Sequence, residues 1–230
     1  MPTVLLVRHG RTAANATGVL AGRSAGIPLD ETGLAQVDAL ASRLQNVRLA
    51  TVVTSPLDRC VATATALTAG RRGLSPTVDE RLTECGYGEW TGRPIRELSR
   101  TKLWRQVQAH PSAAAFPGGE SMRAMQARAV DAIREHDARV AAASGDSATW
   151  VAVSHGDVIK AVVADALGMH LDAFQRIIVD PASVTVITYT DLRPFVVHLN
   201  HTDDRFSIAA GPRRRRRSSD ADVGGGSGTE

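Results

Sequence analysis

Short apolar runs alternate along the chain with longer stretches in which apolar residues recur every three or four positions. The short runs are rich in β-branched residues and carry no charge, which is typical of strands buried on both faces of a sheet. They lie at residues 3–7, 50–54 and 150–153. The stretches with helical spacing lie at residues 31–45 and 57–67, from Ser121 to Val140, and from His155 to Leu167.

This alternation predicts an α/β fold, a three-layer sandwich with a mostly parallel central sheet and helices on both faces. Two final apolar runs, 184–189 and 195–199, are separated by Asp191-Leu192-Arg193-Pro194, which indicates a hairpin. Residues 77–119 are less regular and richer in Gly, Pro and Trp. We expect this middle segment to form a small cap over the sheet.

One helix start can be read in detail. The second strand runs into Ser55-Pro56-Leu57-Asp58. Ser55 is a suitable N-cap, Pro56 suits the first helical position, and Asp58 suits the first turn. The sequence therefore predicts a helix that begins at Ser55.

The chain has 230 residues, a length that favours one domain with a large core. We expect that domain over residues 1–210. Residues 211–230 hold Arg213 to Arg217, a Ser pair and a Gly-rich run, a composition typical of a disordered tail. This tail carries five of the 27 Lys and Arg and three of the 24 Asp and Glu, so the rest has a net charge of only +1. The charge therefore gives little support to a nucleic-acid partner.

Several other classes of protein are not favoured. No apolar run approaches the roughly 18 residues that span a bilayer, so we expect no membrane contact. The first apolar run is cut off by Arg8 and His9, unlike a signal peptide, which favours a cytoplasmic location. Cys60 and Cys85 are too few for a disulfide framework or a zinc site and are expected to be small buried side chains, although each adjoins a candidate catalytic residue.

Two histidines occupy the same context. His9 follows the first strand and His155 the third, and each precedes a glycine. In a parallel sheet both would lie at the carboxyl edge, where α/β folds bind ligands, and the glycines would let backbone N–H groups approach an anion. Arg8 adjoins His9, and Arg59 lies early in the helix after the second strand. Three segments therefore bring two arginines and two histidines together.

This set of side chains suits a phosphoryl group. Guanidinium groups bind phosphate oxygens in pairs and stay charged at any working pH. A neutral imidazole can attack phosphorus, and a second can stabilise the transferring group. We expect no metal or other cofactor, since these cations could fill the electrostatic role that Mg²⁺ has in kinases, and the sequence offers no obvious carboxylate cluster to hold one.

The order of these motifs resembles the histidine phosphatase superfamily, the phosphoglycerate mutase-like proteins, over about residues 3–189. The matching segments are Val7-Arg8-His9-Gly10-Arg11-Thr12 with Asn15, Leu29-Asp30-Glu31-Thr32-Gly33-Leu34-Ala35-Gln36, Ser55-Pro56-Leu57-Asp58-Arg59-Cys60, Arg81-Leu82-Thr83-Glu84 with Gly88, and Val153-Ser154-His155-Gly156. Pro117-Gly118-Gly119-Glu120-Ser121 is similar to a stretch common in the phosphatase-type branch.

The resemblance implies a role for each matching residue. His9 would be the nucleophile and His155 the second pocket histidine, while Glu84 would be the acid and then the base. Arg8 and Arg59 would bind phosphate. Further phosphate or substrate contacts would come from Asn15, Gly22 and Gly156. As the acid, Glu84 must be protonated before the first step, which predicts a raised pKa.

One position departs from the family pattern. Family members often carry Glu where this chain has Thr91, so a contact made there cannot be carried over. Glu89 is close by and is the alternative candidate for the acid, while Glu84 could instead be a surface carboxylate beside Arg81.

The sequence thus predicts phosphomonoester hydrolysis through a phosphohistidine on a small phosphorylated metabolite. The alternative is a phosphoglycerate mutase, which returns the phosphoryl group to an organic acceptor. Family mutases have a longer excursion between acid and second histidine than the one from Cys85 to Ser154, which favours the phosphatase. A third reading is a binding protein that uses the basic tail. Apolar residues near 184–199 would permit a homodimer.

Overall fold

The computed structural model describes residues 2–203, which form an α/β fold around one six-stranded sheet in the order β3-β2-β4-β1-β5-β6. The strands are β1 (Thr3–Arg8), β2 (Leu49–Thr54), β3 (Pro76–Val78), β4 (Thr149–Ser154), β5 (Val184–Tyr189) and β6 (Pro194–His201). The α-helices are α1 (Ala13–Thr17), α2 (Glu31–Leu44), α3 (Asp58–Thr68), α4 (Ile95–Leu98), α5 (Lys102–Ala109), α6 (Met122–Ser144) and α7 (Gly156–Ala166). Four short 3-10 helices complete the elements: η1 (Glu80–Leu82), η2 (Gly88–Trp90), η3 (Pro111–Ala113) and η4 (Leu171–Arg176).

Parallel pairing sets the edge of the sheet at which the histidines lie. β1 is parallel to β4, with Val7 opposite Val153, and β4 and β3 are both parallel to β2. The carboxyl ends of these strands therefore meet at one edge. The antiparallel pairs of the sheet are β1–β5 and β5–β6, so β5 runs opposite to its two neighbours. The mostly parallel sheet and the final hairpin predicted from the sequence are confirmed.

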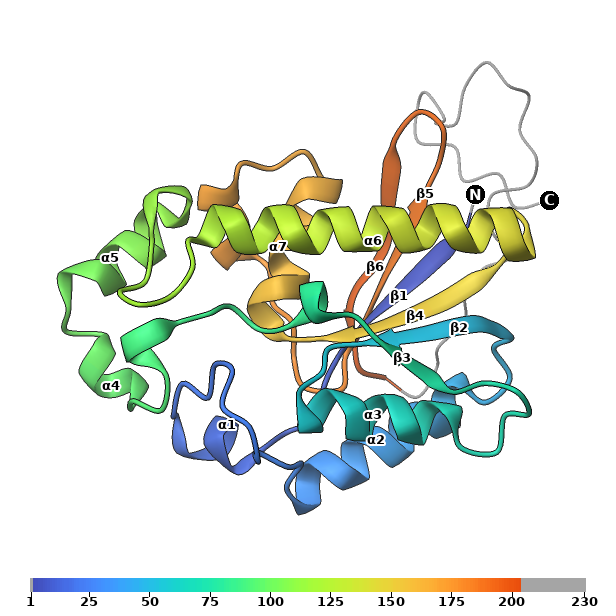
Figure 1. Ribbon diagram of the computed structural model, residues 1–230, viewed down its shortest axis with the longest axis horizontal. Helices are drawn as coiled ribbons and strands as arrows, with labels where there is room; N and C mark the ends of the chain where they lie inside the picture. Colours follow the sequence, from blue (N-terminus) through green and yellow to red (C-terminus); the bar gives the residue numbers. More distant parts are fainter. Residues whose placement is uncertain (1, 204–230) are drawn as a thin grey trace.

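Alternating strand residues serve two hydrophobic layers. Leu5 and Val7 face a core closed by α2 and α3, whereas Val4 and Leu6 face a larger core closed by α6 and α7. Figure 1 shows these helix pairs on opposite sides of the sheet. Both faces are thus buried, which explains why the strands lack the polar alternation of a half-exposed sheet.

The middle segment forms the predicted cap. Figure 1 shows α4 and α5 beyond one end of the sheet, near α1. Aromatic packing holds this cap together: Trp90 lies 6.2 Å from Trp104 and 5.2 Å from Phe116 between ring centroids, and Tyr87 lies 5.0 Å from Phe116. The larger core continues into these residues, so the cap and the main body share one core.

Two local expectations were wrong or incomplete. α3 begins at Asp58 with Leu57 as its N-cap and without a side-chain cap hydrogen bond, so Ser55 does not cap it. Oγ of Ser55 accepts a long hydrogen bond from the N–H of Leu57 at 3.4 Å, and its shorter contact, 2.8 Å, is with Nε2 of His155. The short edge strand β3 was not predicted, because three residues give too short a period to recognise. By contrast, Ser121 does cap α6 through the N–H of Ala124.

The predicted tail 211–230 and the last residues of the predicted domain lie outside the described residues. Within residues 2–203, no helix is long and apolar enough to cross a membrane. The exposed apolar side chains near the hairpin belong to β6 and the turn before it, with Val197 47% and Leu199 44% exposed, whereas β5 is buried throughout.

Candidate active site

His9 follows β1 directly and is 3% exposed. Its Nδ1 lies 2.7 Å from the carbonyl oxygen of Gly10, which can only accept a hydrogen bond, so in the neutral ring Nδ1 carries the proton. Nε2 is then an unprotonated nitrogen, and it accepts from Nε of Arg59 at 3.3 Å. Burial, followed by the charges of Arg59 and Arg8, lowers the pKa of His9 to about 3. The ring is thus held neutral with Nε2 free to act as a nucleophile.

Arg59 lies in the first turn of α3 and is 2% exposed. Its Nη2 donates to the carbonyl oxygen of Gly22 at 2.7 Å and to Nδ1 of His155 at 3.4 Å. The guanidinium therefore touches both imidazoles, whose ring centroids are 5.2 Å apart. It fixes their relative position from a third segment of the chain.

Buried donors without partners make this cluster a candidate anion site. Nε of Arg8 and Nη1 of Arg59 are both buried and have no hydrogen-bond partner. An unsatisfied buried donor on a charged group costs free energy that a bound phosphate oxygen would recover. The Arg8 guanidinium is held in this cluster, because its Nη1 donates to the carbonyl oxygen of Val179 at 2.6 Å.

His155 is fully buried at the end of β4, and its Nε2 lies 2.8 Å from Oγ of Ser55. Since Nδ1 accepts from the Arg59 guanidinium, the neutral ring carries its proton on Nε2 and donates it to Ser55. Burial lowers the pKa of His155 well below its usual value; the neighbouring His9 ring, which would repel a second protonated imidazole, and the charges of Arg59 and Arg8 add to this. Both imidazoles are therefore neutral before an anion binds.

Gly156 opens α7, which follows His155 without a side-chain cap. The first N–H groups of a helix have no partner in the helix and favour an anion. A Cβ at this position would lie 3.5 Å from the Arg8 guanidinium, an ordinary van der Waals distance, so the start of α7 lies against Arg8. The structure therefore places Gly156 beside the predicted phosphate site.

Glu84 follows η1 and joins the same cluster. Its Oε2 lies 4.0 Å from Nδ1 of His155, and its Oε1 accepts from the N–H of Cys85 at 2.8 Å. The side chain is only 13% exposed, which excludes the surface alternative beside Arg81. Burial, followed by the charge of Asp157, raises the pKa of Glu84 to about 7. A carboxyl group with this pKa can serve as both acid and base near neutral pH.

The backbone at Glu84 is held by an ion-pair bracket consisting of Arg23, Glu120 and Arg128. Nε of Arg23 and Nη2 of Arg128 both donate to the carbonyl oxygen of Glu84, at 2.8 Å and 3.1 Å. Glu120 accepts from both arginines and also from the N–H of Gly86 at 2.8 Å. The Glu120 motif seen in the sequence thus fixes the segment that carries the acid.

The remaining predicted site residues differ in outcome. Gly22 lies at the site, with a φ of +52° and its carbonyl oxygen on Arg59. A side chain there would meet Thr91 at 2.9 Å, so Thr91 packs where family members often have Glu. Asn15 is exposed in α1, and its side-chain oxygen accepts from Thr12 in a capping box. Only its Nδ2 group remains available for a substrate.

Two other expectations need correction. The N–H of Gly10 donates to Oγ1 of Thr63 at 3.2 Å, so it is not offered to an anion; a side chain at Gly10 would instead collide with Gly33 at 2.6 Å. The alternative acid, Glu89, is exposed on the cap. A carboxylate that does act on Glu84 through its charge is Asp157.

Sequence reasoning missed several residues of the site. Ser55, Asp157 and Tyr87 acquire roles only through contacts across the fold, and Tyr87 donates to Oδ2 of Asp157 at 2.7 Å. Cys60 is free and fully buried, with Sγ 3.5 Å from Nε2 of His155, and Cys85 is also free and buried. Burial raises the pKa of both thiols, so they act as packing groups, as expected.

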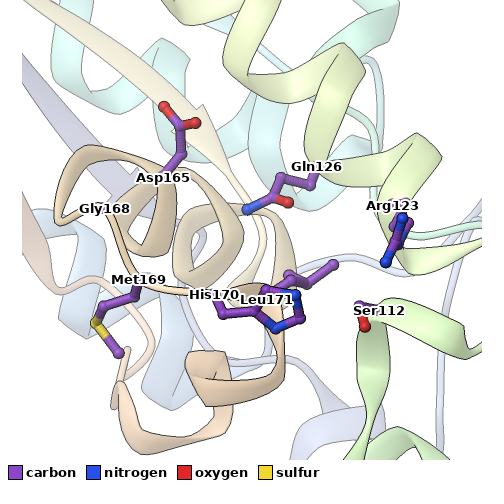
Figure 2. Close-up of a pocket in the computed structure, with 8 residues that line it drawn as sticks. All are labelled: Ser112, Arg123, Gln126, Asp165, Gly168, Met169, His170 and Leu171. Carbon is purple, nitrogen blue, oxygen red and sulfur yellow. The ribbon is translucent and has the colours of Figure 1, made fainter.

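Two cavities lie outside the histidine cluster. One, of about 660 Å³, lies at the far end of α7 and is lined by Ser112, Arg123, Gln126, Asp165, Gly168, Met169, His170 and Leu171 (Figure 2). The other, of about 520 Å³, lies beside Glu84 and is lined by Arg23, Pro56, Leu57, Glu80, Arg81, Thr83, Glu120 and Arg128. The three arginines of this cavity are paired with carboxylates, so the cavity presents little free positive charge to a second acidic group on a substrate.

Comparison with known proteins defines the class. Residues 4–202 match the histidine phosphatase superfamily (branch 1), and the chain belongs to this family. It is 31% identical over 193 residues to a Yersinia pestis protein named "Probable phosphoglycerate mutase GpmB", covering 83% of this chain and 86% of that protein.

Solved structures of the family have the same fold. Bacillus stearothermophilus YhfR superposes with a TM-score of 0.81 at 28% identity, covering 89% of this chain and 99% of the other. A mycobacterial glucosyl-3-phosphoglycerate phosphatase superposes with a TM-score of 0.75 at 27% identity, covering 86% of this chain and 98% of the other. Phosphatases and mutase-like proteins thus both occur among the relatives, and family members act on phosphate groups.

Proposed function

We propose that this protein is a metal-independent phosphomonoester hydrolase that acts through a phosphohistidine on a small phosphorylated metabolite. The observation that supports this most is the state of His9. Its Nδ1 is tied to Gly10, and its Nε2 faces the Arg59 guanidinium among buried donors that have no partner. A nucleophile and an anion site therefore coincide.

In the first step, the phosphate binds to Arg8, Arg59 and the first turn of α7, which neutralise its charge. Nε2 of His9 attacks phosphorus with its lone pair, and the bond from phosphorus to the alcohol oxygen breaks. Glu84 gives its proton to the departing oxygen, so the alcohol leaves neutral. His155 stabilises the oxygens of the transferring group in the transition state.

The second step regenerates the enzyme. Glu84 is now ionised and takes a proton from a water molecule, whose oxygen attacks phosphorus as the bond to Nε2 of His9 breaks. Inorganic phosphate is released, and Glu84 is protonated again. One carboxyl group with a pKa near 7 can supply both functions in turn.

The second candidate is a phosphoglycerate mutase, favoured by the name of the Yersinia relative. The excursion from Cys85 to Ser154 is shorter than the one expected of family mutases, which supports the hydrolase as the first candidate. The difference lies in the fate of the phosphoenzyme, since a mutase must keep water from it until an organic acceptor arrives.

The first experiment is hydrolysis of p-nitrophenyl phosphate by the purified protein in excess EDTA, with His9→Ala as the control. We expect turnover that EDTA does not reduce and that the variant lacks. Loss of activity in EDTA that added metal restores would contradict metal independence. No turnover of any phosphomonoester, together with binding through the basic tail, would favour the binding protein.

A possible homodimer belongs to the same proposal. The exposed apolar side chains Val197 and Leu199 on the edge strand β6 support self-association through this edge. Light scattering after gel filtration tests it, with Val197→Lys as the variant that should give a monomer.

A further inference from the structure

Asp157 carries a partly buried carboxylate close to His155 in the chain, and the proposed mechanism gives it no role. It is the second residue of α7, directly after Gly156. Its Oδ2 accepts from the hydroxyl of Tyr87 at 2.7 Å, and its Oδ1 lies 3.8 Å from Nζ of Lys160. Tyr87 is itself 5% exposed and packs on Phe116 in the cap. The carboxylate is thus held between α7 and the cap by two defined contacts.

The same carboxylate lies next to the segment that carries the proposed acid. It accepts from Tyr87, three residues after Glu84, and it follows by two residues His155, whose Nδ1 lies 4.0 Å from Oε2 of Glu84. Glu84, Cys85 and Tyr87 lie on one stretch of chain, and the charge of Asp157 raises the pKa of all three. For Glu84 it is the largest contribution after burial. A like charge near a buried carboxyl group favours the neutral form of that group.

We propose that Asp157, held in place by Tyr87, is a positioning residue that keeps Glu84 protonated near neutral pH, so that the acid is loaded before each phosphate is cleaved. This inference rests on the proposed function, because it assigns a partner to the acid of that reaction. It differs from the family resemblance, which gave no role to the residue after Gly156.

The opposing charges decide how strong this effect can be. The guanidinium groups of Arg8 and Arg59 favour ionised Glu84 and oppose Asp157. Arg23 and Arg128 touch the carbonyl oxygen of Glu84. The other titratable groups that face Glu84 are His155, Cys60, Cys85 and Tyr87, which are neutral in their buried positions. Glu120, the other carboxylate near this segment, is paired with Arg23 and Arg128. Among the described residues, Asp157 is therefore the carboxylate whose charge favours protonated Glu84.

Lys160 allows the direction of the effect on the pKa of Glu84 to be tested. Its ammonium group offsets part of the Asp157 charge. Removing Asp157 should therefore ease ionisation of Glu84, whereas removing Lys160 should hinder it. The two substitutions are at contacting residues, yet they are expected to shift the pKa of Glu84 in opposite directions. A general loss of structure would not produce opposite shifts.

The experiment is the pH profile of kcat/KM on an alkyl phosphate for four variants and the wild type. In Asp157→Asn the alkaline limb should move to lower pH by about one unit. Tyr87→Phe should move it the same way by less, and Lys160→Met should move it to higher pH. Asp165→Asn removes the same charge from the far end of α7, where Asp165 pairs with Arg134, and should leave the limb in place. Every variant is assayed on one substrate, so ionisation of the substrate cancels.

A second readout separates this inference from the function on which it rests. A ¹³C NMR titration of the Glu84 carboxyl carbon, assigned with Glu84→Gln, should show the same displacement without any turnover. If Asp157→Asn and the wild type gave the same titration curve and the same pH profile, the role of Asp157 would be wrong, while the proposed hydrolase activity would stand. A wild-type protein without phosphatase or mutase activity would instead overturn the proposed function.

Discussion

Oγ of Ser55 lies 2.8 Å from Nε2 of His155, although 100 residues separate the two in the chain. The hydroxyl comes from the loop between β2 and α3, while the imidazole follows β4. Parallel pairing of β2 with β4 brings the two strand ends together. The hydrogen bond fixes the orientation of the ring and leaves Nδ1 directed toward Arg59.

Ser55→Ala should therefore lower kcat by about tenfold, because the His155 ring loses the partner that fixes its proton and orientation. The measurement is kcat on p-nitrophenyl phosphate beside the thermal unfolding midpoint. Thr68→Val is the matched control, since it removes a buried hydroxyl from α3 that bonds only within the helix. An unchanged kcat in Ser55→Ala would show that the ring needs no such support.

Glu84→Gln should separate substrates by their leaving groups. Protonated Glu84 is needed in the first step, and its pKa of about 7 means that this form is lost as the pH rises through neutrality. The rate on alkyl phosphates should thus fall above about pH 7 in the wild type, and this dependence should flatten in the variant. p-Nitrophenyl phosphate needs little protonation and should lose much less activity in phosphorylation of His9. Equal losses on both substrates would make Glu84 a positioning group.

The ion-pair bracket at Glu84 can be tested by replacing its two arginines, Arg23 and Arg128, which donate to the same carbonyl oxygen. Arg128 makes four hydrogen bonds and its side chain is 19% exposed, so Arg128→Ala should destabilise the protein by about 2–4 kcal/mol and lower kcat. Arg23 is 45% exposed, and Arg23→Ala should cost less than about 1 kcal/mol. Urea unfolding measures both, and equal effects of the two substitutions would contradict a buried bracket.

Much of the fold follows from local pattern, whereas the site depends on contacts between distant segments. The strand at Val184–Tyr189 was predicted with its observed bounds, because an apolar run beside a turn signal is a local property. Ser55 was predicted to be only an N-cap because its local sequence suits that position. The bond to His155 depends on strand order, which a single sequence does not state.

Asp157 and Gly10 show the same limit. Asp157 follows a motif glycine and reads as an ordinary first-turn acid, yet its contact with Tyr87 depends on how the cap folds over α7. Gly10 was read as an anion-binding glycine. Its close approach to Gly33 could not be predicted locally, because it depends on where α2 crosses the end of β1. By contrast, the clustering of Arg8, His9, Arg59, Glu84 and His155 was predicted, because each lies beside a strand end or within a motif.

Deleting residues 211–230 should leave kcat and KM on small substrates nearly unchanged. The tail carries few apolar residues with which to pack, and the proposed acid, the proposed nucleophile and both arginines of the cluster lie within residues 2–203. Steady-state kinetics of the shortened and complete chains make the comparison. A large fall in kcat would assign the arginines Arg213 to Arg217 a part in the reaction.

The central claim is covalent transfer to His9, and trapping the phosphoenzyme tests it most directly. Phosphohistidine is stable in base, so a reaction started with ³²P-labelled substrate and quenched rapidly in alkali preserves it for peptide mapping. We predict label on the peptide with His9, none in His9→Ala, and loss of the label to water within about one turnover. Label on another residue, or no label in an enzyme that turns over, would contradict the mechanism. Label that persists until 3-phosphoglycerate is added would make the protein a mutase.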